Sequence, residues 1–390
     1  MDKLRQKCHD VIGYHFVATK SMEPDGSRPG LFGRSMFPSA GSSSITRPPA
    51  VSILTTSSLQ AGTSPSDSPG VLAPAASPRV DCRSVISEFL RSNTCYDLLE
   101  PSGRTVVFDT KIAINLAFFA LAENEITAAP LWDTEQQQFV GMVTSSDFVE
   151  VIRYFYYDGT ESISDSNSIM GRMSSMDISQ WRNFSLRDRR IHGLLYISPE
   201  DSLYTACKFL DLNGTHRLPV LDPTERIILK VLTHLNVMEY LCSMFRDERP
   251  LFESTIAELG IGTFVRTVVL PRTVPLIQVL DHMSQHKVSA VPLLDELGLV
   301  VDIYSRADVT LLAREGQLSL LDSPVMEVMA LQRAEGLAVS QLFTCRRSDS
   351  LRRIFEMYAA ARVHCLVCID EEGRPEGVVS LTDVFGYFVR

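Results

Sequence analysis

One arrangement of apolar and polar positions recurs along this chain. The stretch from Val288 to Ala313, VSAVPLLDELGLVVDIYSRADVTLLA, has two β-rich apolar runs, Val291 to Leu294 and Leu299 to Tyr304, on either side of a polar Asp-Glu-Leu-Gly turn. Residues at helical spacing follow from Ser305 onward. The pattern predicts a strand, a hairpin turn, a second strand and a helix, with Ser305 and Asp308 in the first turn of that helix.

The same arrangement occurs three more times, beginning at Pro130, Leu218 and Cys365. In every copy an Asp lies in the hairpin turn, an Asp or Asn follows thirteen or fourteen residues later, and a Ser or Thr stands three residues before that second position. Four copies of one β-α-β-β-α unit predict an α+β fold built from repeats. In chain order the turn residues are Asp133, Asp222, Asp295 and Asp370, the second positions are Asp147, Asn236, Asp308 and Asp383, and the hydroxyl positions are Thr144, Thr233, Ser305 and Ser380.

Boundaries follow from the repeats and from the composition between them. Residues 21 to 78 are rich in Ser, Pro, Gly, Ala and Thr, and they cannot bury enough apolar surface to offset the ordering entropy of the chain. We therefore expect a disordered Ser/Pro-rich extension over 1–84 and an exposed polar connector over 158–177. The four repeats are expected at 92–157, 185–245, 262–318 and 339–390, with first helices over 112–124, 201–212 and 349–361 in repeats one, two and four.

A single unit of this kind leaves one face of its small sheet uncovered. Two units packed face to face cover both sheets, so four repeats predict two pairs. Clefts between paired repeats are the natural place for ligands.

The charge and the apolar runs narrow the class of protein. The formal net charge is -10, which argues against a surface built to neutralise nucleic-acid phosphates or anionic lipid. Apolar runs stay shorter than the ~18 residues of a membrane-spanning helix, and the N-terminus lacks the apolar core of a signal peptide. We expect a cytoplasmic protein that could also enter the nucleus. The one CxxC pair, Cys365 and Cys368, lies on a predicted strand that points the two side chains to opposite faces, so we expect no metal site.

The repeated Ser/Thr-x-x-Asp is the candidate binding element. A carboxylate can accept charge-assisted hydrogen bonds from both hydroxyls of a ribose. The N-terminus of a helix also favours a nearby phosphate, through its free backbone N–H groups and its dipole. The alternative is an ordinary helix capping box, which has the same spacing. Recurrence at one place in four units favours ribose binding, and the sequence contains no nucleophile elbow, P-loop or kinase catalytic loop.

These features resemble the CBS repeat, and their order is similar to that of the gamma regulatory subunits of AMP-activated protein kinase. The phrases that carry the resemblance include AAPLWD at 128–133, FVGMVTSSDF at 139–148, THRLPVLDP at 215–223, VVDIYSRADV at 300–309 and VVSLTDVF at 378–385. The resemblance covers about 85 to 390. It implies two CBS pairs (Bateman modules) in a flat disc, AMP, ADP and ATP as ligands without a cofactor, and a heterotrimer with a catalytic alpha subunit and a scaffold beta subunit.

The resemblance also implies which residues bind the nucleotides. Asp147, Asp308 and Asp383 would be the ribose ligands of three sites, and Asn236 marks a position that is empty. Basic residues would meet the phosphates at the centre; for His216 and Arg217 the alternative is a solvated strand edge. Besides the three aspartates, the implied site residues are His216, Arg217, His364, Lys287, Ser289, Thr263, Thr144, Ser305, Ser380 and Thr382.

Three positions depart from the family pattern. Thr127 stands where the family carries Arg, Leu235 where it carries Lys, and Cys365 where it carries a second Arg. Two of these losses fall on the Asp147 site, which we expect to be weak or lost. Cys365 should lower affinity at the Asp308 site, and the site of the fourth repeat is the best preserved. The chain therefore reads as a divergent paralogue.

Two functions are expected from these features. The first is a non-catalytic regulatory subunit that senses energy state by binding adenine nucleotides. The second is an assembly subunit of the kinase complex in which nucleotide binding has decayed. An enzyme regulated by its CBS part is disfavoured, because the additional sequence is the low-complexity N-terminus.

Overall fold

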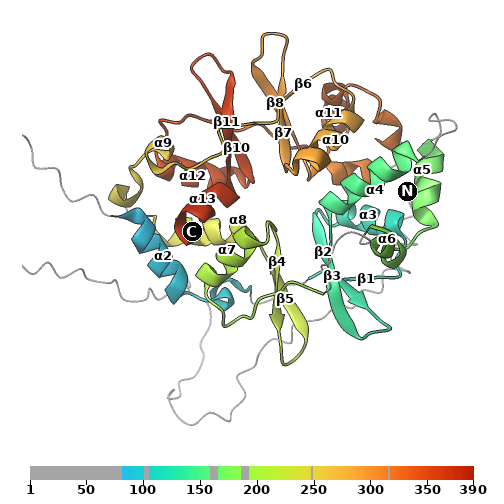
Figure 1. Ribbon diagram of the computed structural model, residues 1–390, viewed down its shortest axis with the longest axis horizontal. Coiled ribbons are helices and arrows are strands. Elements are labelled where there is room, and N and C mark those ends of the chain that lie inside the picture. Colours follow the sequence, from blue (N-terminus) through green and yellow to red (C-terminus); the bar gives the residue numbers. More distant parts are fainter. Residues whose placement is uncertain (1–80, 101–104, 159–165, 186–192, 247–248, 315–316) are drawn as a thin grey trace, which may run out of the picture. The chain divides into compact units, whose positions relative to one another are not determined.

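A computed structural model describes residues 81–100, 105–158, 166–185, 193–246, 249–314 and 317–390 (Figure 1). The disordered extension expected over 1–84 lies outside the described residues up to position 80. The prediction of disorder is wrong for the last three residues of this range, because helix α2 (Cys82–Ser92) begins there. The side chain of Asp81 accepts from the backbone N–H of Arg83 at the start of the helix. Cys82, Ile86 and Leu90 form a buried stripe at helical spacing, which orders the start of this segment.

The four repeats contain the same small sheet. In repeats one, three and four the first strand pairs in parallel with the second, and the second pairs antiparallel with the third. In repeat two the first strand is reduced to a single bridge between Ile197 and Val220.

The elements of each repeat have the following bounds. Repeat one comprises β1 (Phe108–Asp109), α3 (Ile114–Glu123), β2 (Ala128–Asp133), β3 (Gln138–Thr144) and α4 (Ser145–Tyr157), and repeat two comprises α7 (Leu203–Leu212), β4 (Leu218–Asp222), β5 (Ile227–Leu232) and α8 (His234–Met244). Repeat three comprises β6 (Leu270–Pro271), α10 (Leu276–His286), β7 (Ala290–Leu294), β8 (Val300–Ser305) and η4 (Asp308–Ala313), and repeat four comprises β9 (Thr344–Cys345), α12 (Leu351–Ala361), β10 (Cys365–Ile369), β11 (Pro375–Ser380) and α13 (Leu381–Val389).

The local predictions agree with these elements except at one helix. The two strands predicted from the repeating phrase are β7 and β8, and the three predicted first helices are α3, α7 and α12, each within two residues of its expected ends. The predicted α-helix after Ser305 is wrong, because η4 is a 3-10 helix that starts at Asp308. In this repeat the hydroxyl of Ser305 and one oxygen of Asp308 bond to Ser340 instead of closing a capping box.

The prediction of an exposed connector over 158–177 is also wrong. This range contains α5 (Ser166–Ser174), followed by α6 (Ile178–Ser185). Met173, Ile178 and Trp181 are buried in the core of repeat one. Their few apolar side chains, at helical spacing in an otherwise polar stretch, are enough to dock both helices.

Segments that lead into the repeats are exchanged between neighbours. The lead-in segment of repeat one carries α2 and η1 (Cys95–Leu98), and that of repeat two carries α5 and α6. The lead-in segment of repeat three carries η3 (Arg249–Phe252) and α9 (Ile256–Leu259), and that of repeat four carries η5 (Gln317–Leu320) and α11 (Val325–Ala334). Each bonds to the start of the first helix in the other repeat of its pair, so repeats one and two form one pair and repeats three and four the other. The exchanges are marked by backbone N–H to carbonyl hydrogen bonds from Cys95 to Asp201, Ile178 to Ile112, Ile256 to Asp349 and Val325 to Val274.

Two hydrophobic cores cross this pairing. The helices of repeat one pack on those of repeat three, burying Phe118 and Phe148 together with Leu280 and Tyr304. The second core joins repeats two and four in the same way. Figure 1 shows α4 beside α10, and α13 beside α8. Each fully buried large apolar side chain contributes about 1.5–3 kcal/mol, so every repeat is held both by its sequence neighbour and by a more distant repeat.

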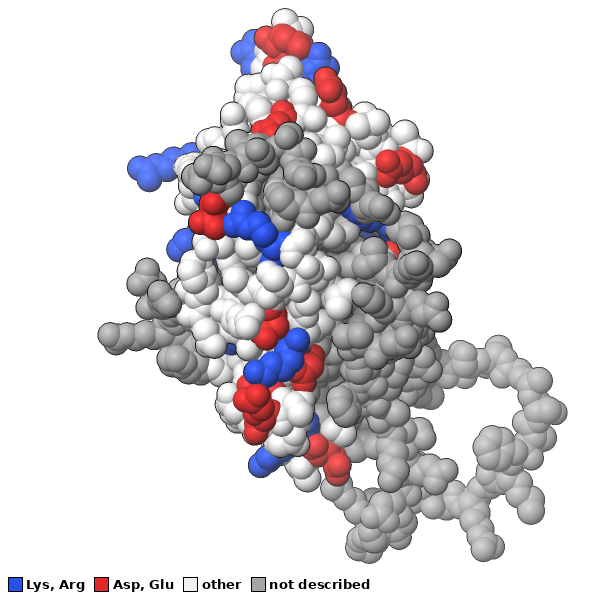
Figure 2. Space-filling view, turned by 90° about the vertical axis from the view of Figure 1, so that its right-hand side faces the viewer, with Lys and Arg blue, Asp and Glu red and all other residues white. Residues whose placement is uncertain are grey.

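The described surface is mixed in charge. Figure 2 shows Lys and Arg side chains interspersed with Asp and Glu on one face, unlike the basic stripe of a nucleic-acid-binding surface. Among the residues that the structure describes, no helix has the length and apolar content needed to cross a membrane.

Candidate functional site

Three of the four repeats close the same capping box at the start of their second helix. In α4 the backbone N–H and the hydroxyl of Thr144 both donate to Oδ2 of Asp147, at 2.7 and 2.8 Å. In α8 Thr233 donates the same two hydrogen bonds to Oδ1 of Asn236, at 3.0 and 2.9 Å. Because Asn236 caps its helix without a charge, capping does not require an acid. The acids in the other repeats are therefore available for a second role.

Asp383 uses its two oxygens for two tasks. Oδ2 accepts from the backbone N–H and the hydroxyl of Ser380 at 2.8 and 2.6 Å, and Oδ1 accepts from the hydroxyl of Thr263 at 3.2 Å. Thr263 is held there because its backbone pairs with Val378 in β11. One oxygen thus caps the helix, while the other faces the junction of repeats three and four beside an exposed hydroxyl.

Asp308 has a different environment, with only 1% of its surface exposed. Its Oδ2 accepts from the backbone N–H of Ser305 and its Oδ1 from the backbone N–H of Ser340, both at 2.7 Å. Burial raises the pKa of Asp308, although these hydrogen bonds oppose the shift. The carboxylate expected to bind ribose in repeat three is thus engaged by the chain itself.

His216, Arg217 and His364 lie close together, as expected from their positions before the hairpins of repeats two and four. Desolvation by the surrounding chain, followed by the charges of Arg306 and Arg217, lowers the pKa of His216 to about 4, although the residue is exposed at the surface. Burial, then the charges of Arg217 and His216, lowers the pKa of His364 to about 4. Burial also lowers the pKa of Arg217, to about 10. We call His216, Arg217, His364 and the neighbouring Arg306 the basic cluster. At neutral pH its positive charge comes from Arg217 and Arg306.

Both arginines of the basic cluster reach into repeat one. Arg217 donates to the hydroxyl of Thr127, and Nη1 of Arg306 donates to the hydroxyl of Ser146 at 2.8 Å. Thr127, which stands where the family pattern has an Arg, thus accepts a hydrogen bond from Arg217. Arg306 is absent from the residues predicted from the sequence. Its place inside the Ser-x-x-Asp motif of repeat three was the signal that could have identified it.

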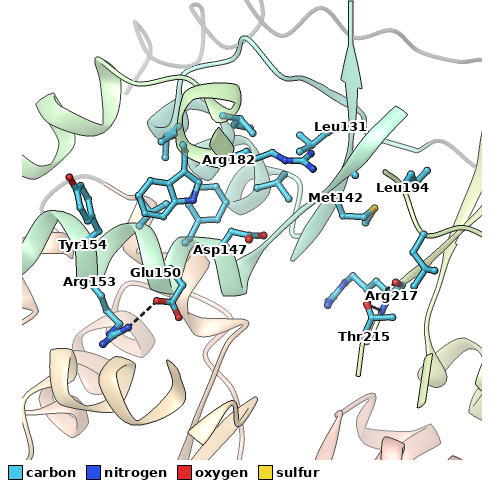
Figure 3. A pocket seen from close by; sticks show the side chains of 18 of the residues that line it. Leu131, Met142, Asp147, Glu150, Arg153, Tyr154, Arg182, Leu194, Thr215 and Arg217 are labelled. Carbon is cyan, nitrogen blue, oxygen red and sulfur yellow. Dashed lines mark hydrogen bonds and ion pairs between the residues drawn. The ribbon is translucent and has the colours of Figure 1, made fainter. Parts of the chain in front are cut away.

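A pocket of about 900 Å³ lies between repeat one, α6 and repeat two. In Figure 3 the side chains of Asp147, Arg182 and Arg217 approach it from three different segments, and Leu131 and Met142 contribute apolar wall. A volume of this size is typical of small-ligand sites. Thr127 and Leu235 stand where the family pattern has basic residues at this site, but three arginines, Arg153, Arg182 and Arg217, still line the pocket.

Arg182 was missed because the sequence predicted no element over 178–184, between the expected connector and the second repeat. It comes from α6, and its Nη2 donates to the backbone carbonyl of Val140 at 2.9 Å. Burial lowers the pKa of Arg182, and the charge of Asp147 opposes that shift.

Of the other predicted site residues, Ser289 contacts the basic cluster and Lys287 is exposed. Ser289 lies 3.2 Å from Nε2 of His216, which brings it into the basic cluster. Lys287 is exposed at the end of α10, where its backbone φ is 55°. Within the described part of the chain, neither Lys287 nor the half-buried Thr382 makes a side-chain hydrogen bond or ion pair. Cys365 begins β10 opposite Ser380, and burial raises its pKa to about 12.

Comparison with known sequences gives two kinds of match. A family model described as CBS domain matches residues 262–314 and 334–390, within repeats three and four and the segment between them. The 5'-AMP-activated protein kinase subunit gamma of Dictyostelium discoideum is 39% identical over 313 residues, covering 79% of this chain and 53% of that relative. The subunit gamma-3 of Homo sapiens is 38% identical over 303 residues, covering 77% of this chain and 60% of that relative. The chain thus spans a little over half the length of these relatives.

Comparison with solved structures supports the fold. A crystal structure of a protein from Methanocaldococcus jannaschii matches 76% of this chain and 99% of its own length, with a TM-score of 0.59. The sequences are 17% identical, so this likeness concerns the fold alone.

Proposed function

This chain is a CBS-repeat protein related to the gamma subunits of AMP-activated protein kinase, and from that premise we propose that it is a non-catalytic regulatory subunit of a kinase of that type. It binds AMP, ADP and ATP in clefts between its repeats. Its partners are a catalytic alpha subunit and a scaffold beta subunit, which complete a heterotrimer.

The observation that carries the proposal is the basic cluster of His216, Arg217, Arg306 and His364, which come from three repeats. A nucleoside monophosphate carries about -1.5 to -2 charges, so a site without cations would be weak. Arginine offers a phosphate two parallel N–H donors. The junctions that hold these cations also hold the acids of the capping boxes, which suit a ribose.

Regulation requires more than binding. AMP and ATP share adenosine and compete for one cleft, but they place different charge beside the basic cluster. A nucleotide shifts the kinase only if it prefers one conformation of the complex, because equal affinity for both conformations shifts nothing.

The test is a calorimetric titration of AMP and of ATP into the full chain and into Asp383→Asn. The Asn should keep the helix cap, as Asn236 does in α8, and should remove only the charge-assisted bond to ribose. We expect one site to be lost or weakened roughly 10–100-fold, as for a hydrogen bond to a charged group. Asp370→Asn, in the hairpin turn of the same repeat, is the matched control and should bind like the unmodified chain.

A second variant tests the basic cluster. Arg217→Gln should weaken binding and reduce its dependence on salt, because a charge that faces phosphate is removed. If the unmodified chain binds neither nucleotide at millimolar concentration, the nucleotide-sensing proposal fails. The alternative, an assembly subunit of the kinase complex, would then stand, and the enclosed Asp308 and the neutral Cys365 favour it.

A further inference from the structure

The Asp308 carboxylate is closed by a segment that lies 32 residues further along the chain. Ser340, between α11 and β9, donates its backbone N–H to Oδ1 at 2.7 Å, and its hydroxyl oxygen lies 2.7 Å from that of Ser305. Each oxygen of Asp308 thus accepts one backbone N–H, and the residue is only 1% exposed, so a ribose cannot approach the carboxylate while Ser340 is in place. In contrast, Oδ1 of Asp383 meets an exposed threonine hydroxyl.

An ion pair holds Ser340 from its other side. The carbonyl of Ser340 accepts from Nη2 of Arg333 at 3.1 Å, and Arg333 binds both oxygens of Asp302, at 2.6 and 3.0 Å. Asp302 is 5% exposed, and the backbone N–H of Ile303 also donates to it. A two-point contact between Arg and a carboxylate fixes the orientation of the guanidinium. The position of Ser340 is therefore set by a buried acid in β8.

Building on the proposed function, we propose that residues 338–343 are a built-in plug of the nucleotide site in repeat three, and that the Asp302–Arg333 pair is the latch that keeps the plug closed. AMP reaches Asp308 only after Ser340 has left it. The apparent affinity of such a site is its intrinsic affinity reduced by the fraction of open molecules.

The plug also connects the site to repeat four. Its last residue, Phe343, accepts a backbone hydrogen bond from Val367 in β10, and β9 follows directly. Withdrawal of Ser340 therefore pulls on the edge strand of the neighbouring repeat. Occupancy of the repeat-three site is in this way transmitted within the pair of repeats three and four.

The first measurement needs no variant and no nucleotide. Hydrogen exchange on the full chain should show the Ser340 amide protected roughly tenfold or more over the amides of Glu371 and Glu372 in the hairpin turn of repeat four. Exchange at the rate of those turn amides would overturn the plug.

The second measurement opens the latch. The double variant Asp302→Asn with Arg333→Gln removes the ion pair without leaving one buried charge alone. It should speed exchange at Ser340 and raise AMP affinity at one site by roughly tenfold or more, a gain that Asp308→Asn then abolishes. The matched control is Glu296→Gln with Arg272→Gln, an ion pair of the same repeat that is 70% and 42% exposed, which should change neither reading.

The outcomes separate the plug from the proposed function. The plug is overturned if Asp308→Asn alone removes an AMP site whose affinity the latch variant leaves unchanged. If no form binds AMP or ATP, the proposed function fails, and closure of Asp308 by the latched segment stands only if Ser340 is protected and the latch variant releases it.

Discussion

Arg153 in α4 and Asp281 in α10 form an ion pair, with Nε 2.7 Å from Oδ1, that joins repeat one to repeat three. The side chains are 22% and 16% exposed. Nη1 of Arg153 also donates to Ser284 in α10 at 2.7 Å. The contact therefore lies on the boundary of the core that crosses the pairing of neighbouring repeats.

Asp281→Asn should lower the free energy of unfolding by about 1–3 kcal/mol, because it removes one of the two carboxylates that compensate a largely enclosed guanidinium and leaves Glu150 as the other. Urea unfolding measures the change. Glu296→Gln, which breaks the exposed pair with Arg272, is the control and should cost less than about 0.5 kcal/mol. Equal losses in the two variants would show that the contact between repeats one and three adds nothing beyond a surface pair.

Met173→Ala should destabilise the chain by about 2–5 kcal/mol, because the side chain is fully buried and its loss leaves a cavity. Thermal unfolding monitored by circular dichroism is the readout. Met244→Ala, at a side chain that is 42% exposed on α8, should have a much smaller effect. A small effect at Met173 would mean that α5 does not belong to the core.

Asn236→Ala should cost up to about 1 kcal/mol of stability, because it removes the acceptor for the backbone N–H of Thr233 while Thr233 still caps α8, and it should leave AMP binding unchanged. Asn236→Asp should keep the stability, since an acid caps α4 and α13 with the same geometry. Calorimetry with AMP alongside urea unfolding measures both properties. A loss of AMP binding in Asn236→Ala would place a ligand in repeat two, which the sequence predicts to be empty.

Acid should destabilise the fold through His234. This residue is 3% exposed, and its ring stacks on Phe385 with centroids 5.0 Å apart. Burial, followed by the charge of His216, lowers its pKa to about 3, against an opposing effect of Asp211. The unfolded chain takes up this proton near pH 6.5, so stability is present above that pH and is lost as pH falls toward 3. From pH 7 to pH 5 this residue should cost about 2 kcal/mol.

Urea unfolding at pH 7 and pH 5 tests this expectation. His234→Phe keeps an aromatic ring against Phe385 and removes the titration, so its loss of stability over this range should be smaller by about 2 kcal/mol. His286→Gln, at an exposed histidine, should keep the pH dependence of the unmodified chain. An unchanged dependence in His234→Phe would contradict the assignment.

Several features of the site could be anticipated from the sequence. The Ser/Thr-x-x-Asp spacing predicted ribose binding, with a helix capping box as the alternative, and the structure shows capping boxes in α4, α8 and α13. The family resemblance placed His216, Arg217 and His364 together, and their role in nucleotide binding stays a prediction. Arg182 and Met173 could not be anticipated in the same way. A polar stretch with a few apolar residues reads as a loop, and it becomes a helix only because another repeat supplies a surface on which those residues can be buried.

Local signals were enough to find four repeats, to bound two of their strands and three of their helices within two residues, and to identify the family. Those signals depend on residues a few positions apart, whose periodicity and turn chemistry do not need the rest of the chain. The exchange of lead-in segments and the sharing of cores by alternate repeats needed the folded chain. Four similar repeats have similar apolar faces, and the choice among partners depends on how all of them pack at once. The contrast between Asp308 and Asp383 has the same origin, since their motifs are alike and Ser340, far along the chain, encloses only the first.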